Sequence, residues 1–435
     1  MKRAIDILWL LLLGAFVFAG LPIATFHGDE TYHIYTSTDY NTLFIEHRPQ
    51  DLLVHSLWES DSGYQRLMNG GLTRYAIGLT WHLAGMSAAD LPTHGYLFGS
   101  SYEENAAWGY VPDVDDLTIF RLSSTLFTAL SVAVMFLIGR LYGGRPLAYL
   151  VSALYTLNPV ILLNGRRAMQ EGVLLFFGLL TIYIALSIAS RREAMLPVRW
   201  RWWLSLIIAG ALALASKYSG FVYLIPAYLA IVLPELLRRS AATLPLVGGL
   251  VLCAVLTLAL FFALSPGLWY DPAARIRDVI QGRFDVIQTQ VGLDPGAPTS
   301  LTQRAVAIFT QPFMTTVQHY EIAPVAPPDQ IARYMESPLN GVQFGTIFGG
   351  LLTLLAMFGL VVSAVPRLRL NPSRALAAGL YLWLAVNVAA LMVNPLPWQR
   401  YYLPLIPVMT LLAGSALLSL IALMRRAPTA RLDYA

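Results

Sequence analysis

The sequence has very little charge and a single cysteine. Asp, Glu, Lys and Arg make up only 12% of its 435 residues, against roughly a quarter in ordinary soluble domains. Hydrophobic residues make up 57%, so the chain lacks the polar surface that would cover a water-soluble globule. Because Cys253 stands alone, an internal disulfide is impossible, and its apolar surroundings indicate a small core residue. These shortages exclude a disulfide-bonded soluble domain and favour a membrane protein.

Long apolar runs are abundant. A spanning helix needs about 20 mostly apolar residues, and the sequence offers ten candidates: 5–26, 119–139, 146–164, 172–190, 203–216, 218–237, 243–265, 345–365, 375–393 and 401–424. The first resembles a signal peptide, but no convincing cleavage site follows, so we expect it to be retained. Because lipid cannot satisfy free backbone groups, we predict an all-α polytopic membrane protein with about ten transmembrane helices.

Basic residues follow the predicted spans in a regular way. With the N-terminus in the cytoplasm, the six inside segments hold sixteen of the 29 Lys and Arg residues. These sixteen are Lys2, Arg3, Arg140, Arg145, Arg191, Arg192, Arg199, Arg201, Arg238, Arg239, Arg367, Arg369, Arg374, Arg425, Arg426 and Arg431. The bias predicts cytoplasmic N- and C-termini in a plasma (inner) membrane.

Two long segments, 27–118 and 266–344, fall on the outer side. The first carries thirteen acidic residues against three basic ones, and six of the seven histidines. Within it, 72–86 is apolar with a helical period but too short to span, which indicates an interfacial helix. Aromatic residues around 32–44 indicate another. We expect a core over 1–265, a second extracytoplasmic loop over 266–344, and C-terminal transmembrane helices over 345–435.

Four basic residues in short outer connections oppose the charge bias. They are Arg166, Arg167, Lys217 and Arg400. An ionisable residue at membrane depth is a functional hypothesis by default, and such a cluster could hold the phosphate of a lipid-linked substrate. The alternative is that each side chain extends to the outer headgroups. Glu171 also has a structural alternative to a role in function, in which it complements the helix dipole or forms an ion pair with Arg167.

The stretch "FHGDETYH" at 26–33 places two carboxylates directly after the first span. Asp29 and Glu30 could simply begin a helix, with His33 on the same face. They could also take a proton, because a carboxylate at the edge of a low-dielectric cavity can deprotonate a hydroxyl. A sugar–phosphate donor leaves as an anion if cations stabilise it. One base and a few cations are therefore a sufficient set for glycosyl transfer.

Three stretches resemble polyprenyl-phosphate-sugar-dependent glycosyltransferases. They are "RLSSTLFTALSVAVMFLIGRLYGGRPLAYLVSALYTLNPVILLNGRRAMQEGVLLFFGLLTIYIAL" (121–186), "SKYSGF", and "RYYLPLIPVMTLLAG" (400–414). This is the GT-C superfamily, which includes protein O-mannosyltransferases and the aminoarabinose transferase that modifies lipid A. The resemblance covers most of 1–240 and the last span, whereas 266–344 has no counterpart.

The resemblance implies roles for single residues. Asp29 matches the general base, Glu30 its companion, and Glu171 a second functional acid. Lys217 matches a basic residue that contacts the donor phosphate, although here two residues separate it from the following glycine. Arg400 stands before the Tyr-Leu-Pro run, beside Tyr401, much as a basic residue does in relatives. Arg121 has a weaker correspondence, and a position facing the membrane explains it equally well.

The acceptor stays open at this point. The β-trefoil insert of eukaryotic O-mannosyltransferases and the C-terminal soluble domain of the lipid A enzymes have no counterpart in this sequence. A lipid, a glycan or a protein hydroxyl therefore remains possible. Together with the absence of these modules, the compact build indicates a prokaryotic origin.

Metal and cofactor sites are not predicted. His27, His33 and Asp29 lie close in sequence but lack a recognised ligand spacing, so we expect no required cofactor, with a divalent metal as the minor alternative. Nucleic-acid binding is excluded, because topology scatters the basic residues. A transporter or flippase, or a lipid-binding protein without catalysis, is the rival class. Such carriers often show inverted repeats, and the sequence has no clear one.

The sequence thus favours an inverting membrane glycosyltransferase that moves a hexose or pentose from a polyprenyl-phosphate donor to a hydroxyl acceptor. Asp29 deprotonates the acceptor and Glu30 orients it. The residues expected to bind substrate are Arg166, Arg167, Glu171, Lys217, Arg400, Tyr401 and His33. Membrane lipids are the other expected partner.

Overall fold

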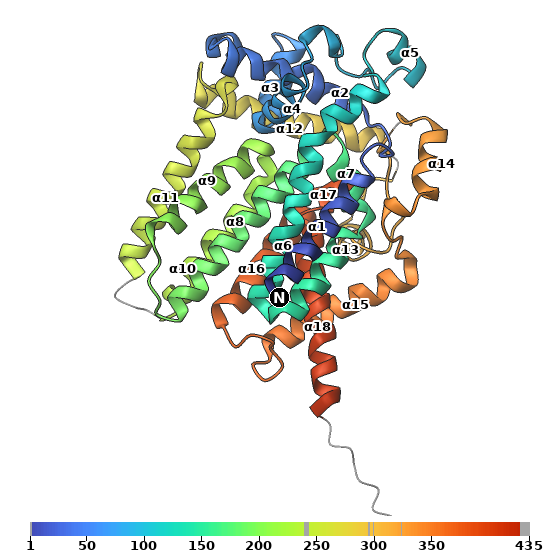
Figure 1. The fold of residues 1–435 in the computed structure, drawn as a ribbon. Coiled ribbons are helices and arrows are strands. Elements are labelled where there is room, and N and C mark those ends of the chain that lie inside the picture. Colours follow the sequence, from blue (N-terminus) through green and yellow to red (C-terminus); the bar gives the residue numbers. More distant parts are fainter. Residues whose placement is uncertain (1, 239–242, 295, 299, 323, 427–435) are drawn as a thin grey trace, which may run out of the picture.

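The chain folds into a bundle of long helices (Figure 1). A computed structural model describes residues 2–238, 243–294, 296–298, 300–322 and 324–426, and within these ranges every regular element is a helix, which confirms the all-α class. Arg239 and Arg431 of the predicted inner charges lie outside the described residues. The bundle contains α1 (Lys2–Ala19), α6 (Val114–Thr156), α7 (Pro159–Arg166), α8 (Gln170–Glu193), α9 (Trp200–Ser216), α10 (Phe221–Arg238), α11 (Thr243–Ala263), α15 (Gly345–Ala364), α16 (Arg374–Val393) and α18 (Leu405–Arg426).

Seven of the described helical segments are long and apolar enough to cross a membrane. They contain α6, α8, α10, α11, α15, α16 and α18. α9 is apolar but has only 17 residues, and α1 has 18. The multi-pass membrane class is therefore confirmed, while the number of ten crossings remains a prediction.

α6 contains two antiparallel arms, which explains how one element accounts for two predicted spans. Gly143 and Gly144 have non-helical backbone angles, and Gly144 adopts a φ of 72° that glycine tolerates. Beyond this turn the chain packs back on itself, and the Ser131 and Tyr155 hydroxyl oxygens lie 2.9 Å apart. Asn158 then starts α7, because its side chain accepts hydrogen bonds from two backbone N–H groups. The returning arm and α7 together correspond to the predicted span 146–164.

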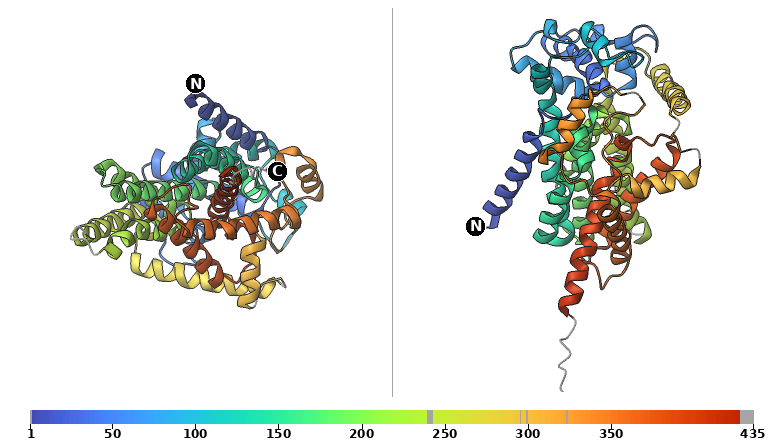
Figure 2. Two further views of the ribbon diagram at one scale, coloured as in Figure 1. Left: turned by 90° about the horizontal axis from the view of Figure 1, so that it is seen from below. Right: turned by 90° about the vertical axis from the view of Figure 1, so that its right-hand side faces the viewer.

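Shorter helices cover one end of the bundle (Figures 1 and 2). Segment 27–118 supplies α2 (Gly28–Tyr35), η1 (Thr36–Thr38), η2 (Asn41–Ile45), η3 (Pro49–Leu52), α3 (Asp61–Met68), α4 (Gly71–Leu83), η4 (Ala88–Asp90) and α5 (Tyr102–Ala107). Later segments contain η5 (Tyr218–Gly220), η6 (Pro266–Leu268), α12 (Pro272–Leu293), α13 (Leu301–Thr310), α14 (Pro328–Glu336), η7 (Pro338–Asn340) and α17 (Gln399–Tyr402). Of these, the longer α12 lies near the covered end, whereas α13 lies lower, against α15 and α16 (Figure 1). The apolar stretch predicted to be an interfacial helix at 72–86 is α4.

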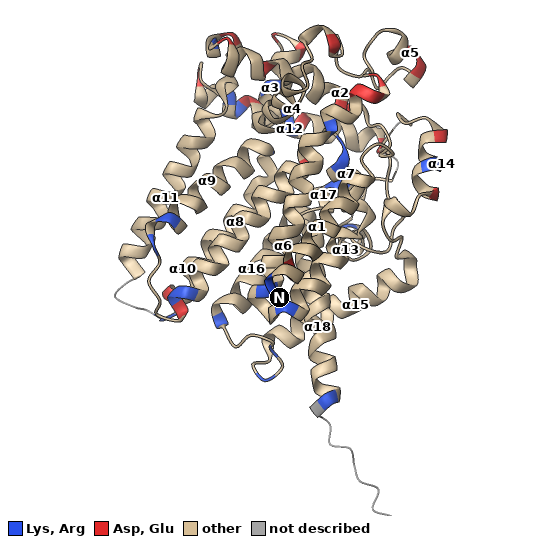
Figure 3. Cartoon of the chain, viewed as in Figure 1, with Lys and Arg blue, Asp and Glu red and all other residues tan. Residues whose placement is uncertain are grey.

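The two ends of the molecule differ in charge (Figure 3). Acidic residues gather at the end that carries α2, α3 and α5, whereas Lys and Arg residues lie at the opposite ends of α10, α16 and α18. This is the arrangement that the charge pattern of the sequence predicts, with the long segments together on the acidic side.

α8 and α18 form the centre of the bundle. Of the most apolar window of each helix, 78% of the residues in α8 and 72% in α18 are buried, against 22% in the peripheral α11. The N-terminus of α8 and the short α17 ahead of α18 both end beneath the covering helices. The most buried of the spanning helices therefore present Glu171 and Arg400 to the same region as α2.

Candidate active site

The start of α2 directs its two carboxylates to different places. His27 caps the helix. Its side-chain Nδ1 accepts from the Asp29 backbone N–H at 3.1 Å, and its backbone N–H donates to the Glu30 carboxylate at 3.2 Å. The opposite ring nitrogen lies 2.7 Å from Glu321. The cap therefore fixes Glu30 toward the interior and leaves Asp29 on the open side of the helix.

Glu30 is fully buried and lies outside the cavities described below. Arg121 donates to both of its oxygens, at 2.7 and 2.6 Å, and the Ala168 N–H donates at 2.8 Å. Burial raises the pKa of Glu30, but Arg121 and the hydrogen bonds outweigh it and hold this pKa below its usual range. This geometry joins α2 to α6 and to the α7–α8 connection, which fits a positioning role.

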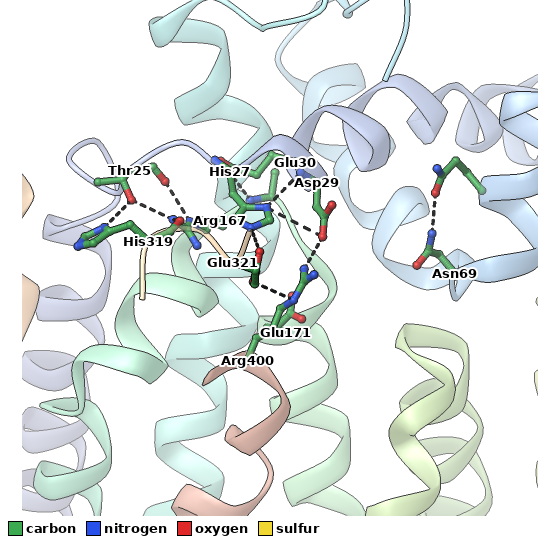
Figure 4. A network of polar contacts seen from close by, with 12 residues as sticks. Thr25, His27, Asp29, Glu30, Asn69, Arg167, Glu171, His319, Glu321 and Arg400 are labelled. Carbon is green, nitrogen blue, oxygen red and sulfur yellow. Dashed lines mark hydrogen bonds and ion pairs between the residues drawn. The ribbon is translucent and has the colours of Figure 1, made fainter. Parts of the chain in front are cut away.

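Asp29 lies against Arg400, which it shares with a second carboxylate (Figure 4). Arg400 contacts Asp29 through Nη1, and its Nε forms an ion pair with Glu321 at 3.1 Å. The guanidinium also packs on the rings of Trp398 and Tyr401, at 5.1 and 5.8 Å from their centroids. One arginine therefore balances two acids that come from α2 and from segment 266–344.

These charges shift the acidity of both carboxyl groups. Burial raises the pKa of Asp29, yet Arg400 and His27 more than offset this and hold it well below its usual range. The same opposition between burial, which raises the pKa, and the attraction of Arg400 and His27, which lowers it, leaves Glu321 with a pKa of about 2. Asp29 is consequently ionised at neutral pH, and its basicity depends on how strongly Arg400 holds it.

Lys217 and Glu171 form the second ion pair of the site. Lys217 ends α9 in an extended conformation, and its Nζ donates to Glu171 Oε1 at 2.7 Å. The ammonium lies 5.6 Å from the centroid of the Tyr401 ring. Glu171, in the first turn of α8, is 2% exposed. Tyr401 thus lies near both cations, Lys217 and Arg400.

A first cavity of about 250 Å³ brings most of these groups together. Its lining residues are Asp29, Tyr32, His33, Tyr64, Gln65, Met68, Asn69, Phe98, Met169, Gln170, Glu171, Lys217, Arg283, Gln290, Arg400 and Tyr401. Burial lowers the pKa of His33 to about 4, against the pull of Asp29 and Glu171, so this histidine is neutral at pH 7. Five predicted site residues besides Asp29 therefore line this space: His33, Glu171, Lys217, Arg400 and Tyr401.

A second cavity of about 470 Å³ meets the first at Asp29 and Arg400. It is lined by His27, Asp29, Phe98, Gly99, Gln290, Leu293, Tyr320, Glu321, Ile322, Val325, Trp398 and Arg400. Phe98 and Gln290 also border both spaces. Asp29 thus faces two adjoining compartments, one rich in cations and the other largely apolar and aromatic.

Arg166 and Arg167 lie away from both cavities. Arg166 donates to the backbone oxygens of Val17, Phe16 and Leu339. Arg167 donates to the backbone and side-chain oxygens of Thr25, and to the carbonyl of His319 (Figure 4). At 0% and 1% exposure these arginines join distant backbone segments, so their predicted substrate contacts would require movement.

Two charged residues of the site were not predicted from the sequence. Arg283 on α12 lines the first cavity and donates to the Met68 carbonyl. Glu321 follows α13 in an irregular stretch. Arg283 stands in a stretch whose apolar residues recur at three- and four-residue intervals, as in an amphipathic helix, so a wall position could have been inferred. A lone acid such as Glu321 carries no comparable signal.

A metal site does not emerge from this geometry. Among the described residues, no group of three or more His, Cys, Asp or Glu side chains is arranged to hold a metal ion. The independence from metals and other cofactors expected from the sequence stays a prediction.

Comparison with known proteins identifies the fold. Residues 91–270 match the family model described as dolichyl-phosphate-mannose-protein mannosyltransferase. The structure resembles ArnT from Cupriavidus metallidurans bound to undecaprenyl phosphate, with a TM-score of 0.55, 13% identity and 97% of this chain covered. It also resembles the archaeal oligosaccharyltransferase AglB from Archaeoglobus fulgidus in complex with an inhibitory peptide and a dolichol-phosphate, with a TM-score of 0.52, 13% identity and 100% covered. The curated protein sequences gave no match.

The resemblance to GT-C membrane glycosyltransferases expected from the sequence is thereby confirmed. The chain spans 63% of the ArnT chain and 53% of the AglB chain. The family match ends at residue 270, so Arg283, Glu321 and Arg400 all lie beyond it.

Proposed function

We propose that this chain is a glycosyltransferase that moves a sugar from a polyprenyl-phosphate donor to a hydroxyl acceptor at the extracytoplasmic face of a plasma membrane. One observation carries the proposal: Asp29 borders a cavity that also contains Lys217, Arg283 and Arg400. The match to the mannosyltransferase family model and the fold shared with two proteins whose structures contain polyprenyl or dolichol phosphates support it.

The reaction assigns one compartment to each substrate. The donor phosphate enters the first cavity, where three basic side chains offer it charge-assisted hydrogen bonds. The acceptor enters the second cavity and presents its hydroxyl to Asp29. The acceptor oxygen then bonds to the anomeric carbon while the bond from that carbon to the phosphate oxygen breaks. Attack from the side opposite the phosphate inverts the anomeric centre.

Arg400 couples phosphate binding to the strength of the base. In the resting geometry it neutralises Asp29 and lowers the pKa of that carboxyl group. A phosphate that draws this guanidinium toward the first cavity weakens its hold on Asp29 and raises the basicity of the carboxylate. Asp29 then takes the acceptor proton as polyprenyl phosphate departs with its negative charge held by Lys217, Arg283 and Arg400.

The test compares Asp29→Asn with Glu30→Gln in proteoliposomes that contain radiolabelled polyprenyl-phosphate sugars. We expect Asp29→Asn to lower the transfer rate at least about 100-fold, the usual scale for a lost general base, with donor binding retained. Glu30→Gln should instead lower the Tm, because it leaves Arg121 as an unpaired buried charge, a loss worth about 3–5 kcal/mol.

Full transfer activity in Asp29→Asn would remove this residue as the base. Movement of unchanged lipid-linked sugar across the bilayer, with no new glycosidic bond, would favour the rival class of transporters and flippases.

A further inference from the structure

Two polar side chains in the first cavity have atoms without a hydrogen-bond partner among the described residues. They are Gln170 and Glu171, with Nε2 of the first and Oε2 of the second unpaired. Both side chains line the cavity, and they are only 3% and 2% exposed. Buried polar atoms are normally paired, and leaving one unpaired costs about 1–3 kcal/mol. Unpaired polar atoms on two consecutive residues that line a cavity indicate a ligand that completes their bonding.

The carboxylate of Glu171 is already oriented for such a ligand. Its Oε1 accepts from Lys217 at 2.7 Å, which fixes the group and leaves Oε2 available. Lys217 is one of the cations assigned to the donor phosphate, and this phosphate is attached to the anomeric carbon of the sugar. The first substituent of the sugar beyond that attachment is the one on the neighbouring carbon, C2, so it lies nearest to a carboxylate that shares Lys217.

We propose that Glu171 and Gln170 form a sugar subsite that requires a hydrogen-bond donor on C2 of the transferred sugar. This inference rests on the proposed function and narrows its donor to sugars with a C2 hydroxyl or ammonium group. An ionised carboxylate only accepts hydrogen bonds. A 2-deoxy sugar leaves Oε2 unsatisfied and is therefore rejected, as happens wherever a site is built to hydrogen-bond a substrate hydroxyl.

The experiment compares three polyprenyl-phosphate donors that differ only at C2: the hydroxy sugar, its 2-deoxy analogue and the 2-amino-2-deoxy analogue. With wild-type protein in proteoliposomes, we expect kcat/KM for the 2-deoxy donor to fall roughly 10- to 100-fold, as a hydrogen bond to a charged group implies. The amino donor should recover part of this loss, because its ammonium donates to the Glu171 carboxylate but cannot accept from the Gln170 amide. Equal use of the hydroxy and 2-deoxy donors, or an amino donor as poor as the 2-deoxy donor, would overturn the subsite.

Variants of Glu171 and Gln170 test whether these residues cause the discrimination at C2. In Glu171→Met and in Gln170→Leu the preference for the hydroxy over the 2-deoxy donor should shrink, most strongly in the first. Gln65→Leu is the matched control, since Gln65 lines the same cavity but its amide oxygen already accepts from Asn69 at 2.8 Å. This control should keep the wild-type ratio. A ratio that is unchanged in both subsite variants contradicts the assignment, and the wild-type comparison stands even if one variant fails to fold.

Binding measurements separate this inference from the proposed function. If no donor yields product, equilibrium binding of the same three donors, with polyprenyl phosphate alone as the sugar-free reference, still tests the subsite. Discrimination at C2 without transfer supports the subsite and refutes the glycosyltransferase. Transfer of the sugar without discrimination at C2 supports the glycosyltransferase and refutes the subsite.

Discussion

Arg400 serves two carboxylates at once, and this sharing explains why Asp29 stays ionised beside an apolar compartment. A buried acid that lacked such a partner would take up a proton. Glu321 holds the other edge of the guanidinium and is itself bound by His27, the residue that caps α2. Asp29, its cationic partner Arg400 and α2 are therefore linked through one side chain of segment 266–344.

The acidity of Glu321 gives a prediction about stability and pH. Its pKa falls from an ordinary value of 4.5 to about 2 in the folded protein. The stabilisation is therefore complete above about pH 4.5 and is lost as the pH falls toward 2. We expect the Tm of detergent-solubilised wild-type protein to exceed that of Glu321→Gln by a few degrees at pH 7, and this gap to narrow below about pH 4.5 and to close only as the pH approaches 2.

Glu336→Gln is the matched control, because Glu336 is exposed on α14. Its Tm should follow the wild type at every pH. A gap for Glu321→Gln that stays constant down to pH 3 would show that the carboxyl group is not stabilised in its ionised form.

At this scale the sequence predicted which residues share a cavity better than it predicted their contacts. Six of the nine predicted residues line the first cavity, because a charge just past an apolar run must lie at the end of a helix. Glu30, Arg166 and Arg167 satisfy the same rule yet bond to buried partners. Sequence cannot separate these outcomes, since the direction of a side chain depends on partners such as Arg121 and Thr25 that are distant in the chain.

Among the helices of the C-terminal part, α15 approaches α18 closely. A Cβ atom placed on Gly359 would lie 2.3 Å from the Leu412 carbonyl oxygen. This glycine therefore lets α15 pack against the central helix whose preceding turn, α17, carries Arg400. The position of the cation depends on a helix contact well removed from the cavities.

We expect Gly359→Ala to lower the stability by about 1–3 kcal/mol, because the two helices must move apart. Thermal unfolding in detergent measures the effect. Gly350→Ala, on the same helix, is the control: its nearest neighbour is the Met314 methyl carbon at 3.9 Å. There the added methyl group fits, and the change should be neutral or slightly stabilising. Equal Tm values for the two variants would contradict the tight contact.

The long helices were predictable because bilayer thickness fixes their length and lipid fixes their composition. The exceptions have local causes. The predicted spans 119–139 and 146–164 correspond to α6 and α7. The Gly143–Gly144 turn is so short that the two arms it joins form one continuous element, α6. The helices of segment 266–344 were not anticipated, because α12, although its 22 residues are long enough to span, carries charged and polar residues throughout and lacks an apolar run.

Over the whole molecule, charge is divided between the two ends (Figure 3). The proposed reaction needs the end with α2 and both cavities to face away from the cytoplasm. This orientation follows from the positive-inside bias and from no other feature of the chain.

Single-cysteine labelling in intact cells tests the orientation. Cys253 is replaced by Ser, and one exposed cysteine is introduced at Ala107 on α5 or at Ala194 after α8. We expect a membrane-impermeant maleimide to label Ala107→Cys directly and Ala194→Cys only after permeabilisation. The Cys253→Ser parent, which should remain unlabelled, sets the background. The reverse pattern would invert the protein and place the cavities in the cytoplasm.

Gln290 of α12 lies on the wall common to the two cavities. Substitutions in α12 near Gln290 would therefore affect the binding of the sugar donor and of the acceptor at the same time. Under the proposed reaction, a substitution near this wall that admits a new acceptor also alters the selectivity for the lipid-linked donor. The two selectivities are bound to evolve as a pair.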